Sequence, residues 1–172
     1  MNRMAAEIVR EYGPFAEVKT VHGVSFDGNE VWFAAGAELQ AFEPGSGRTT
    51  RAIKTGADAG TAFDGHHLYQ LTGGQIHKID PASGSIVATI PAPGGGRDSG
   101  MAWAEGTLWV GEGREQKIHQ IDPETGKILR TIKSDRFVTG VTWVDGELWH
   151  GTMTAAADRS ELRRIEPTTG EV

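Results

Sequence analysis

This 172-residue chain contains four copies of an internal repeat. Eight polar side chains suited to acid–base chemistry and anion binding lie in segments that differ from one copy to the next. They are His22, Asp58, Arg97, Asp98, Glu112, Arg114, Arg136 and His150. An imidazole beside a carboxylate can transfer protons near neutral pH, and guanidinium groups hold anionic ligands through paired hydrogen bonds. We therefore predict Glu112 and His150 as catalytic residues and the other six as ligand-binding residues.

Two other interpretations fit the same side chains. They can be solvated loop charges and ion pairs between neighbouring sheets, because structural ion pairs also place carboxylates beside basic groups. Alternatively, Asp98, Glu112 and His150 could hold a divalent cation, since the chain offers oxygen and imidazole ligands but no Cys. The sequence contains no Ser-His-Asp, HExxH or dinucleotide-binding fingerprint. We expect no resident metal or other cofactor.

An internal repeat indicates the elements that must position these side chains. Four copies open at Gly23, Gly60, Gly100 and Gly140, at steps of 37, 40 and 40 residues. Short apolar and aromatic runs, separated by Gly, Asp and Pro, indicate several β-strands in each copy. A period near 40 residues with several short strands per copy is typical of a β-propeller blade.

The punctuation within each copy predicts four antiparallel strands, here named a to d in chain order. Strand a leads into an Asp-Gly or Glu-Gly turn, and strand b carries an aromatic residue. Strand c ends in Glu-Pro or Asp-Pro, and a Gly three residues after the Pro precedes strand d. His77 and His119 share one position in strand c, and we expect both to be structural. The prediction is an all-β, single-domain propeller over residues 1–172, with blades at 23–54, 60–90, 100–133 and 140–172.

The last blade lacks a fourth strand, and a matching segment occurs at the N-terminus. Residues 7–12 have the same pattern as residues 127–132, which form strand d of the third copy. We expect this N-terminal strand to complete blade four and close the ring, because pairing removes an exposed sheet edge. A homodimer in which two chains form one eight-bladed ring would pair the same sheet edges. The sequence is therefore compatible with both a monomer and a dimer.

The repeated unit resembles the blades of a known family. Gly-x-x-[Phe/Trp]-x-x-Gly-x-[Leu/Val]-Trp followed by Ile-x-x-Ile-Asp-Pro-x-Thr-Gly resembles the blades of glutamine-cyclotransferase-like propellers. It is also similar to virginiamycin B lyase and quinoprotein-type repeats. The likeness spans residues 7–172 and implies the propeller fold. The His and Glu that the lyases use with magnesium would correspond most nearly to His150 and Glu112, whereas the glutamate of the cyclotransferases is replaced near Val24 and Ser25.

Charge and hydropathy narrow the functions that we expect. The net charge of −6 provides no cationic field for nucleic acid, and no long apolar run indicates a membrane span. We expect a cytoplasmic protein that binds neither nucleic acid nor membrane. The first hypothesis is a propeller scaffold that at most binds a small molecule or a partner at one mouth of the central channel. Such a scaffold could be a natural small form, a truncated form or an engineered form. The alternative is a glutaminyl-peptide-cyclising or lyase-like enzyme that uses His150 or His22 as base and Glu112 or Asp98 as its acidic partner.

Overall fold

The computed structural model describes residues 7–154, 156 and 159–171, which contain fifteen strands. The first sheet consists of β1 (Val24–Phe26), β2 (Val31–Ala34), β3 (Gly36–Phe42) and β4 (Thr49–Ala57). The second consists of β5 (Thr61–Phe63), β6 (Leu68–Thr72), β7 (Gln75–Ile79) and β8 (Ile86–Pro91). The third consists of β9 (Asp98–Ala104), β10 (Thr107–Glu112), β11 (Lys117–Ile121) and β12 (Ile128–Lys133). The fourth consists of β13 (Phe137–Val144), β14 (Glu147–Met153) and β15 (Ser160–Ile165).

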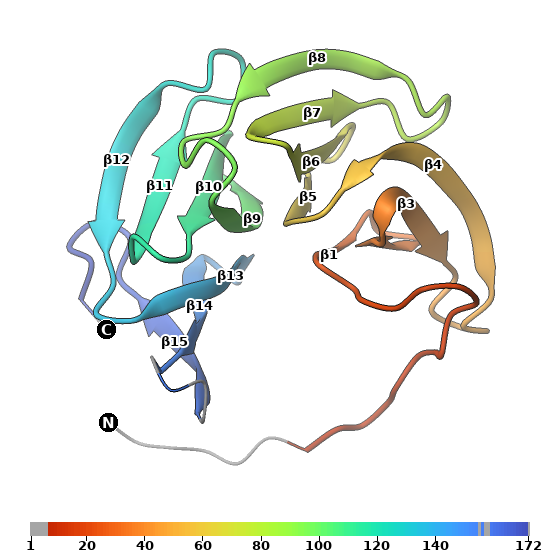
Figure 1. Cartoon of the computed structure of the whole chain (residues 1–172), viewed down its shortest axis with the longest axis horizontal. Coiled ribbons are helices and arrows are strands. Elements are labelled where there is room, and N and C mark those ends of the chain that lie inside the picture. Colours follow the sequence, from red (N-terminus) through yellow and green to blue (C-terminus); the bar gives the residue numbers. More distant parts are fainter. Residues whose placement is uncertain (1–6, 155, 157–158, 172) are drawn as a thin grey trace.

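The four sheets are arranged around a common axis as the blades of a propeller (Figure 1). Within each blade, strands consecutive in the chain pair antiparallel, and β1, β5, β9 and β13 are innermost. The predicted all-β propeller of four repeats is therefore confirmed. No helix in the described part of the chain is long and apolar enough to span a membrane.

Turn glycines explain where the strands stop. The turns between β9 and β10 and between β13 and β14 have two residues with positive φ, Glu105-Gly106 and Asp145-Gly146. This conformation matches the twist of a two-residue hairpin, as predicted. The corresponding turns of the first two blades are longer: Asp27 accepts hydrogen bonds from the backbone N–H groups of Asn29 and Glu30, and Asp64 binds the equivalent turn in the same way.

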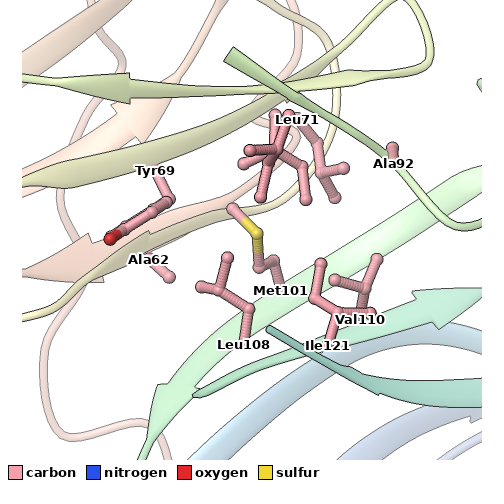
Figure 2. Close-up of a cluster of buried hydrophobic side chains, with 10 residues drawn as sticks. Ala62, Tyr69, Leu71, Ala92, Met101, Leu108, Val110 and Ile121 are labelled. Carbon is pink, nitrogen blue, oxygen red and sulfur yellow. The ribbon is translucent and has the colours of Figure 1, made fainter. Parts of the chain in front are cut away.

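Apolar side chains fill each of the three junctions between consecutive blades. Figure 2 shows the junction of blades two and three, where Tyr69 and Leu71 from one sheet face Met101, Leu108 and Val110 from the next. All five are at most 4 % exposed. The junctions are therefore the hydrophobic core, which is divided into separate layers between blades.

The inner strands meet through glycine. A Cβ atom added to Gly60 would lie 2.4 Å from the backbone nitrogen of Met101, and one added to Gly100 would lie 2.5 Å from Cα of Gly140. Gly23 makes the same approach to blade two. The repeated opening glycine therefore permits backbone-to-backbone contact near the axis.

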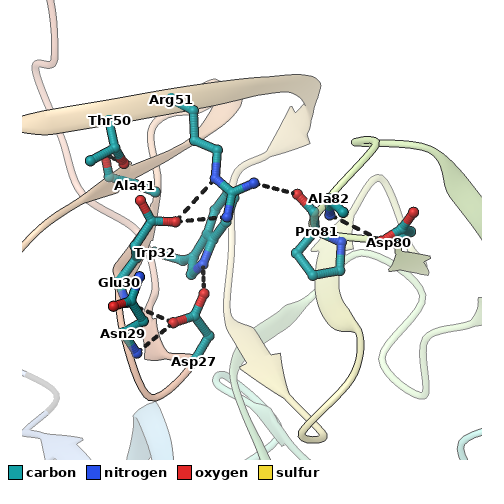
Figure 3. A network of polar contacts seen from close by, with 10 residues as sticks. All are labelled: Asp27, Asn29, Glu30, Trp32, Ala41, Thr50, Arg51, Asp80, Pro81 and Ala82. Atoms are coloured by element: carbon teal, nitrogen blue, oxygen red, sulfur yellow. Dashed lines mark hydrogen bonds and ion pairs between the residues drawn. The ribbon is translucent and has the colours of Figure 1, made fainter.

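An arginine reinforces the outer part of a junction, as shown in Figure 3 for blades one and two. The Arg51 guanidinium lies 4.8 Å from the ring centre of Trp32 and forms a 2.7 Å ion pair with Glu30. It also donates to the Pro81 carbonyl oxygen at 2.9 Å, in the turn after strand c of the next blade. The fourth strand of one blade is thereby attached to the third-strand turn of the next.

The predicted ring closure requires a correction. Residues 7–12 form no strand, and β15 has no partner beyond β14 within the described residues. The N-terminal segment follows blade one instead, because Tyr12 packs on Phe42 and Phe15 stacks on Phe33. Figure 1 shows the resulting open side between blade four and blade one.

Candidate functional site

A buried carboxylate lies at the junction of blades two and three. Glu112, at the end of β10, is 4 % exposed; it forms an ion pair with Arg97 Nη2 and a hydrogen bond with His119 Nε2, each at 3.2 Å. The Nδ1 atom of His119 lies 2.9 Å from the Thr131 hydroxyl. These contacts make a continuous polar chain from an exposed guanidinium to the outer strand of blade three.

Sequence reasoning missed the role of His119 beside Glu112. The strand-c position of His119 predicts a structural role and does not by itself predict its direct contact with Glu112. The signal lies in the hairpin register: Glu112 is opposite Lys117, so His119, two residues further along, shares its face diagonally. Such diagonal neighbours are within reach of long side chains.

Asp98 lies beside Glu112, and backbone N–H groups already donate hydrogen bonds to its carboxylate. It lies opposite Glu112 in the β9–β10 register. Its carboxylate accepts the N–H groups of Gly94 at 2.8 Å and Gly96 at 3.2 Å, and it thereby shapes the loop that carries Arg97. The structure thus brings Arg97, Asp98 and Glu112 together, as the predicted cluster requires.

His150 lies in a different blade from Glu112. It is in β14, 1 % exposed, and neither ring nitrogen has a hydrogen-bond partner among the residues that the structure describes. Burial, reinforced by the positive charge of Arg163, lowers the pKa of His150, while Asp135 opposes this effect. Glu112 and His150 therefore form no hydrogen-bonded catalytic pair in this structure. The described residues contain no group of three His, Asp or Glu side chains arranged to hold a metal.

We expect His150 to make stability depend on pH. Because its pKa is lowered on folding, the unfolded chain binds the proton more readily. Its contribution is therefore fully present above the ordinary His pKa of about 6.5 and is lost as the pH falls below that value, by at most about 1.4 kcal/mol per pH unit. Urea unfolding between pH 7.5 and 5 should show a shallower dependence for His150→Val, which introduces the residue found at the equivalent position 110. An unchanged slope in His150→Val would contradict this assignment.

The other predicted residues lie apart from Glu112 and from one another. Arg136 pairs with Glu161 at 3.1 Å, beside the Arg163–Asp135 ion pair of 2.6 Å. Asp58 and Arg114 are exposed on loops. His22 is exposed and lies at the axis, where its backbone N–H donates to the Ala34 carbonyl oxygen. The structure does not bring all eight residues into one site.

A cavity of about 220 Å³ lies on the axis. Residues from all four inner-strand segments line it: Val21, His22, Gly23, Val24, Gly60, Thr61, Gly100, Met101, Thr139, Gly140 and Val141. The glycines expose backbone groups, and His22 is the one titratable side chain in this lining. The arrangement suits a small molecule that bonds to backbone and hydroxyl groups.

The four antiparallel sheets and the repeat that builds them define the chain as a β-propeller. Residues 73–172 match the family described as outer membrane protein assembly factor BamB, and the chain belongs to that family. No curated protein shows significant sequence similarity to it.

Solved structures show the same fold at low identity. Glutaminyl cyclase from Myxococcus xanthus is 14% identical with a TM-score of 0.67, over 85% of this chain and 74% of that one. BamB from Moraxella catarrhalis is 14% identical with a TM-score of 0.59, over 78% of this chain and 40% of that one. The computationally designed Ika4 protein is 16% identical with a TM-score of 0.58, over 95% of this chain and 100% of that one. The chain thus spans less than half of that BamB chain.

Proposed function

We propose that the chain is a propeller scaffold that binds a small, uncharged polar molecule in its axial cavity. The observation that carries this proposal is the position of the cavity, which is lined by all four blades. Its volume of about 220 Å³ is below the roughly 300–1,000 Å³ of pockets for drug-sized ligands. No Asp, Glu, Lys or Arg side chain is among the lining residues, which favours an uncharged ligand.

The acidic and basic groups support binding over catalysis. Glu112 is 4 % and His150 1 % exposed, whereas a general base must come within hydrogen-bond reach of the proton that it removes. Both carboxylate oxygens of Glu112 already have partners. In our proposal Glu112 therefore stabilises its junction through Arg97 and His119, and neither Glu112 nor His150 reacts with substrate.

Acetamide is a suitable first probe because it is small, neutral and both donates and accepts hydrogen bonds. We expect it to shift backbone NMR signals at the cavity lining, with a dissociation constant on the order of millimolar for so few atoms. His22→Trp should fill the cavity and abolish these shifts, whereas Lys19→Trp, on an exposed residue outside the lining, should leave them intact. Shifts that persist in His22→Trp, or no binding by the unmodified chain, would reject the proposed cavity site.

A second candidate function is cyclisation of glutaminyl peptides. The direct contact between Glu112 and His119 favours this function. Arg97 covers Glu112, but its side chain is 63 % exposed and could move away. The structural similarity to a glutaminyl cyclase is consistent with it. In this mechanism Glu112 would transfer a proton from the attacking α-amino group to the departing ammonia, with His119 holding the carboxylate in place.

Release of ammonia from a glutaminyl peptide tests this second candidate. The enzyme hypothesis predicts turnover that falls by about 100-fold or more in Glu112→Gln, since general acid–base catalysis contributes roughly 10²–10⁴-fold. Glu115→Gln, an exposed glutamate on the following loop, is the matched control. No turnover above the rate with buffer alone would support the binding scaffold.

A further inference from the structure

Blade four has an apolar face that is covered in every other blade. Leu162 occupies the strand-c position of Leu39, Ile76 and Ile118, yet it is 78 % exposed whereas the other three are 0 % exposed. Val144 is 50 % exposed, against 3 % for the equivalent Ala104. A Cβ atom on Gly140 would meet no atom within 4 Å, unlike one on Gly23, Gly60 or Gly100.

Blade one carries the complementary face. Val24 and Phe26 are 59 % and 55 % exposed, whereas Met101 and Val141, which match Val24 in the repeat, are 4 % and 8 % exposed. Rings stack across two packed junctions, Tyr69 on Trp103 at 5.6 Å and Trp109 on Trp143 at 6.3 Å. Trp149 holds the repeat position of Trp109, and Phe26 holds that of Trp103. Each therefore offers one ring of such a stack, and neither has its partner ring among the described residues.

Residues 7–12 lie against blade one in the place where the fourth strand of a preceding blade would lie. Arg10 donates to the Gly45 carbonyl oxygen at 2.9 Å, just as Arg130 donates to the Pro167 carbonyl oxygen at 2.6 Å. Tyr12 lies against Gly47 as Ile132 lies against Gly170. No strand of the described part of the chain pairs with this segment, and Ile8 and Val9 are 75 % and 91 % exposed.

We propose that the open side binds one further propeller repeat, a segment of about 40 residues in the strand order d, a, b, c. Its first strand pairs with β15, and its last strand pairs with residues 7–12. One repeat supplies both missing pairings, because strand d of each blade directly precedes strand a of the next in this chain. A hollow of about 340 Å³ lined by Arg164, Ile165 and Pro167 lies where the first of these strands would begin.

The three packed junctions of the chain are the template for this interaction, and they favour one repeat over a second whole copy. The four blades surround most of the axis in Figure 1, and a single side, between blade four and blade one, is open. The added inner strand would place its glycine against Gly140 and close the open side of the axial cavity. This inference goes beyond the proposed ligand and does not depend on it.

The test compares the chain with a fusion in which a second copy of residues 129–166 follows residue 172. In the chain alone, we expect a monomer of 18.5 kDa by light scattering, with rapid hydrogen exchange at the outward-facing amides of β15. In the fusion, these amides should exchange at least about 100-fold more slowly, and thermal unfolding should shift upward by at least about 5 °C. A control fusion carries Gly140→Asp and Val141→Asp in the appended copy only, and it should show neither change.

Three results would overturn the proposal. The first is equal behaviour of the fusion and its control. The second is a dimer of the unmodified chain with protected β15 amides, which would identify a second copy as the occupant. The third is a monomer with these amides protected, which would mean that residues 7–12 close the ring within one chain. The acetamide titration is a separate measurement, so failure of one proposal is distinguishable from failure of the other.

Discussion

Gly100→Ala is expected to destabilise the propeller severely, with a loss of about 3 kcal/mol in the free energy of unfolding. The added Cβ would lie 2.5 Å from both Cα of Gly140 and the backbone nitrogen of Val141. These neighbours are backbone atoms of an adjacent inner strand, so they cannot rotate away as a flexible side chain would. Relief requires blades three and four to separate, which exposes part of the apolar layer between them.

Gly140→Ala is the matched control for this substitution. Both glycines occupy the same position in the repeat and neither has a positive φ, but a Cβ at residue 140 meets nothing within 4 Å. We expect a change within about 0.5 kcal/mol, as for substitutions away from buried features. Urea unfolding of both variants measures the difference, and similar losses would show that blade four is covered in solution.

The repeat made the architecture predictable because turn chemistry and core positions recur with it. The positive φ of Gly47, Gly84, Gly126 and Gly170 follows from their place three residues after proline. Ring closure was less predictable. A strand pattern in residues 7–12 indicates which type of strand the segment can form, but pairing also depends on where Tyr12 and Phe15 find an apolar surface, and that surface is on blade one.

The candidate site was predictable only in part, for a related reason. Arg97, Asp98 and Glu112 come together because β9 and β10 are neighbours in sequence and in space. The distance between Glu112 and His150 depends instead on packing between blades, which no local pattern encodes. Strand alternation places the side chain of His150 inside the protein, and its lowered pKa follows from that burial.

Trp109→Ala is expected to have the other large effect, a loss of about 3–5 kcal/mol. Trp109 is 3 % exposed in the layer between blades three and four and stacks on Trp143 at 6.3 Å. Its removal forfeits a large apolar contact area and leaves a cavity in a layer that has one sheet on each side. Chemical unfolding followed by far-ultraviolet circular dichroism avoids dependence on the fluorescence of the deleted indole.

Trp149→Ala provides the comparison, because Trp149 holds the same repeat position on the open face of blade four. It is only partly buried, and its Nε1 atom donates to Glu147 at 3.2 Å. We expect a loss of about 1 kcal/mol or less in the chain alone. In the fusion with a further repeat, Trp149 would gain a stacked ring and a covering sheet, so the loss should approach that of Trp109→Ala. An equally small loss in both proteins would mean that the added repeat does not dock on this face.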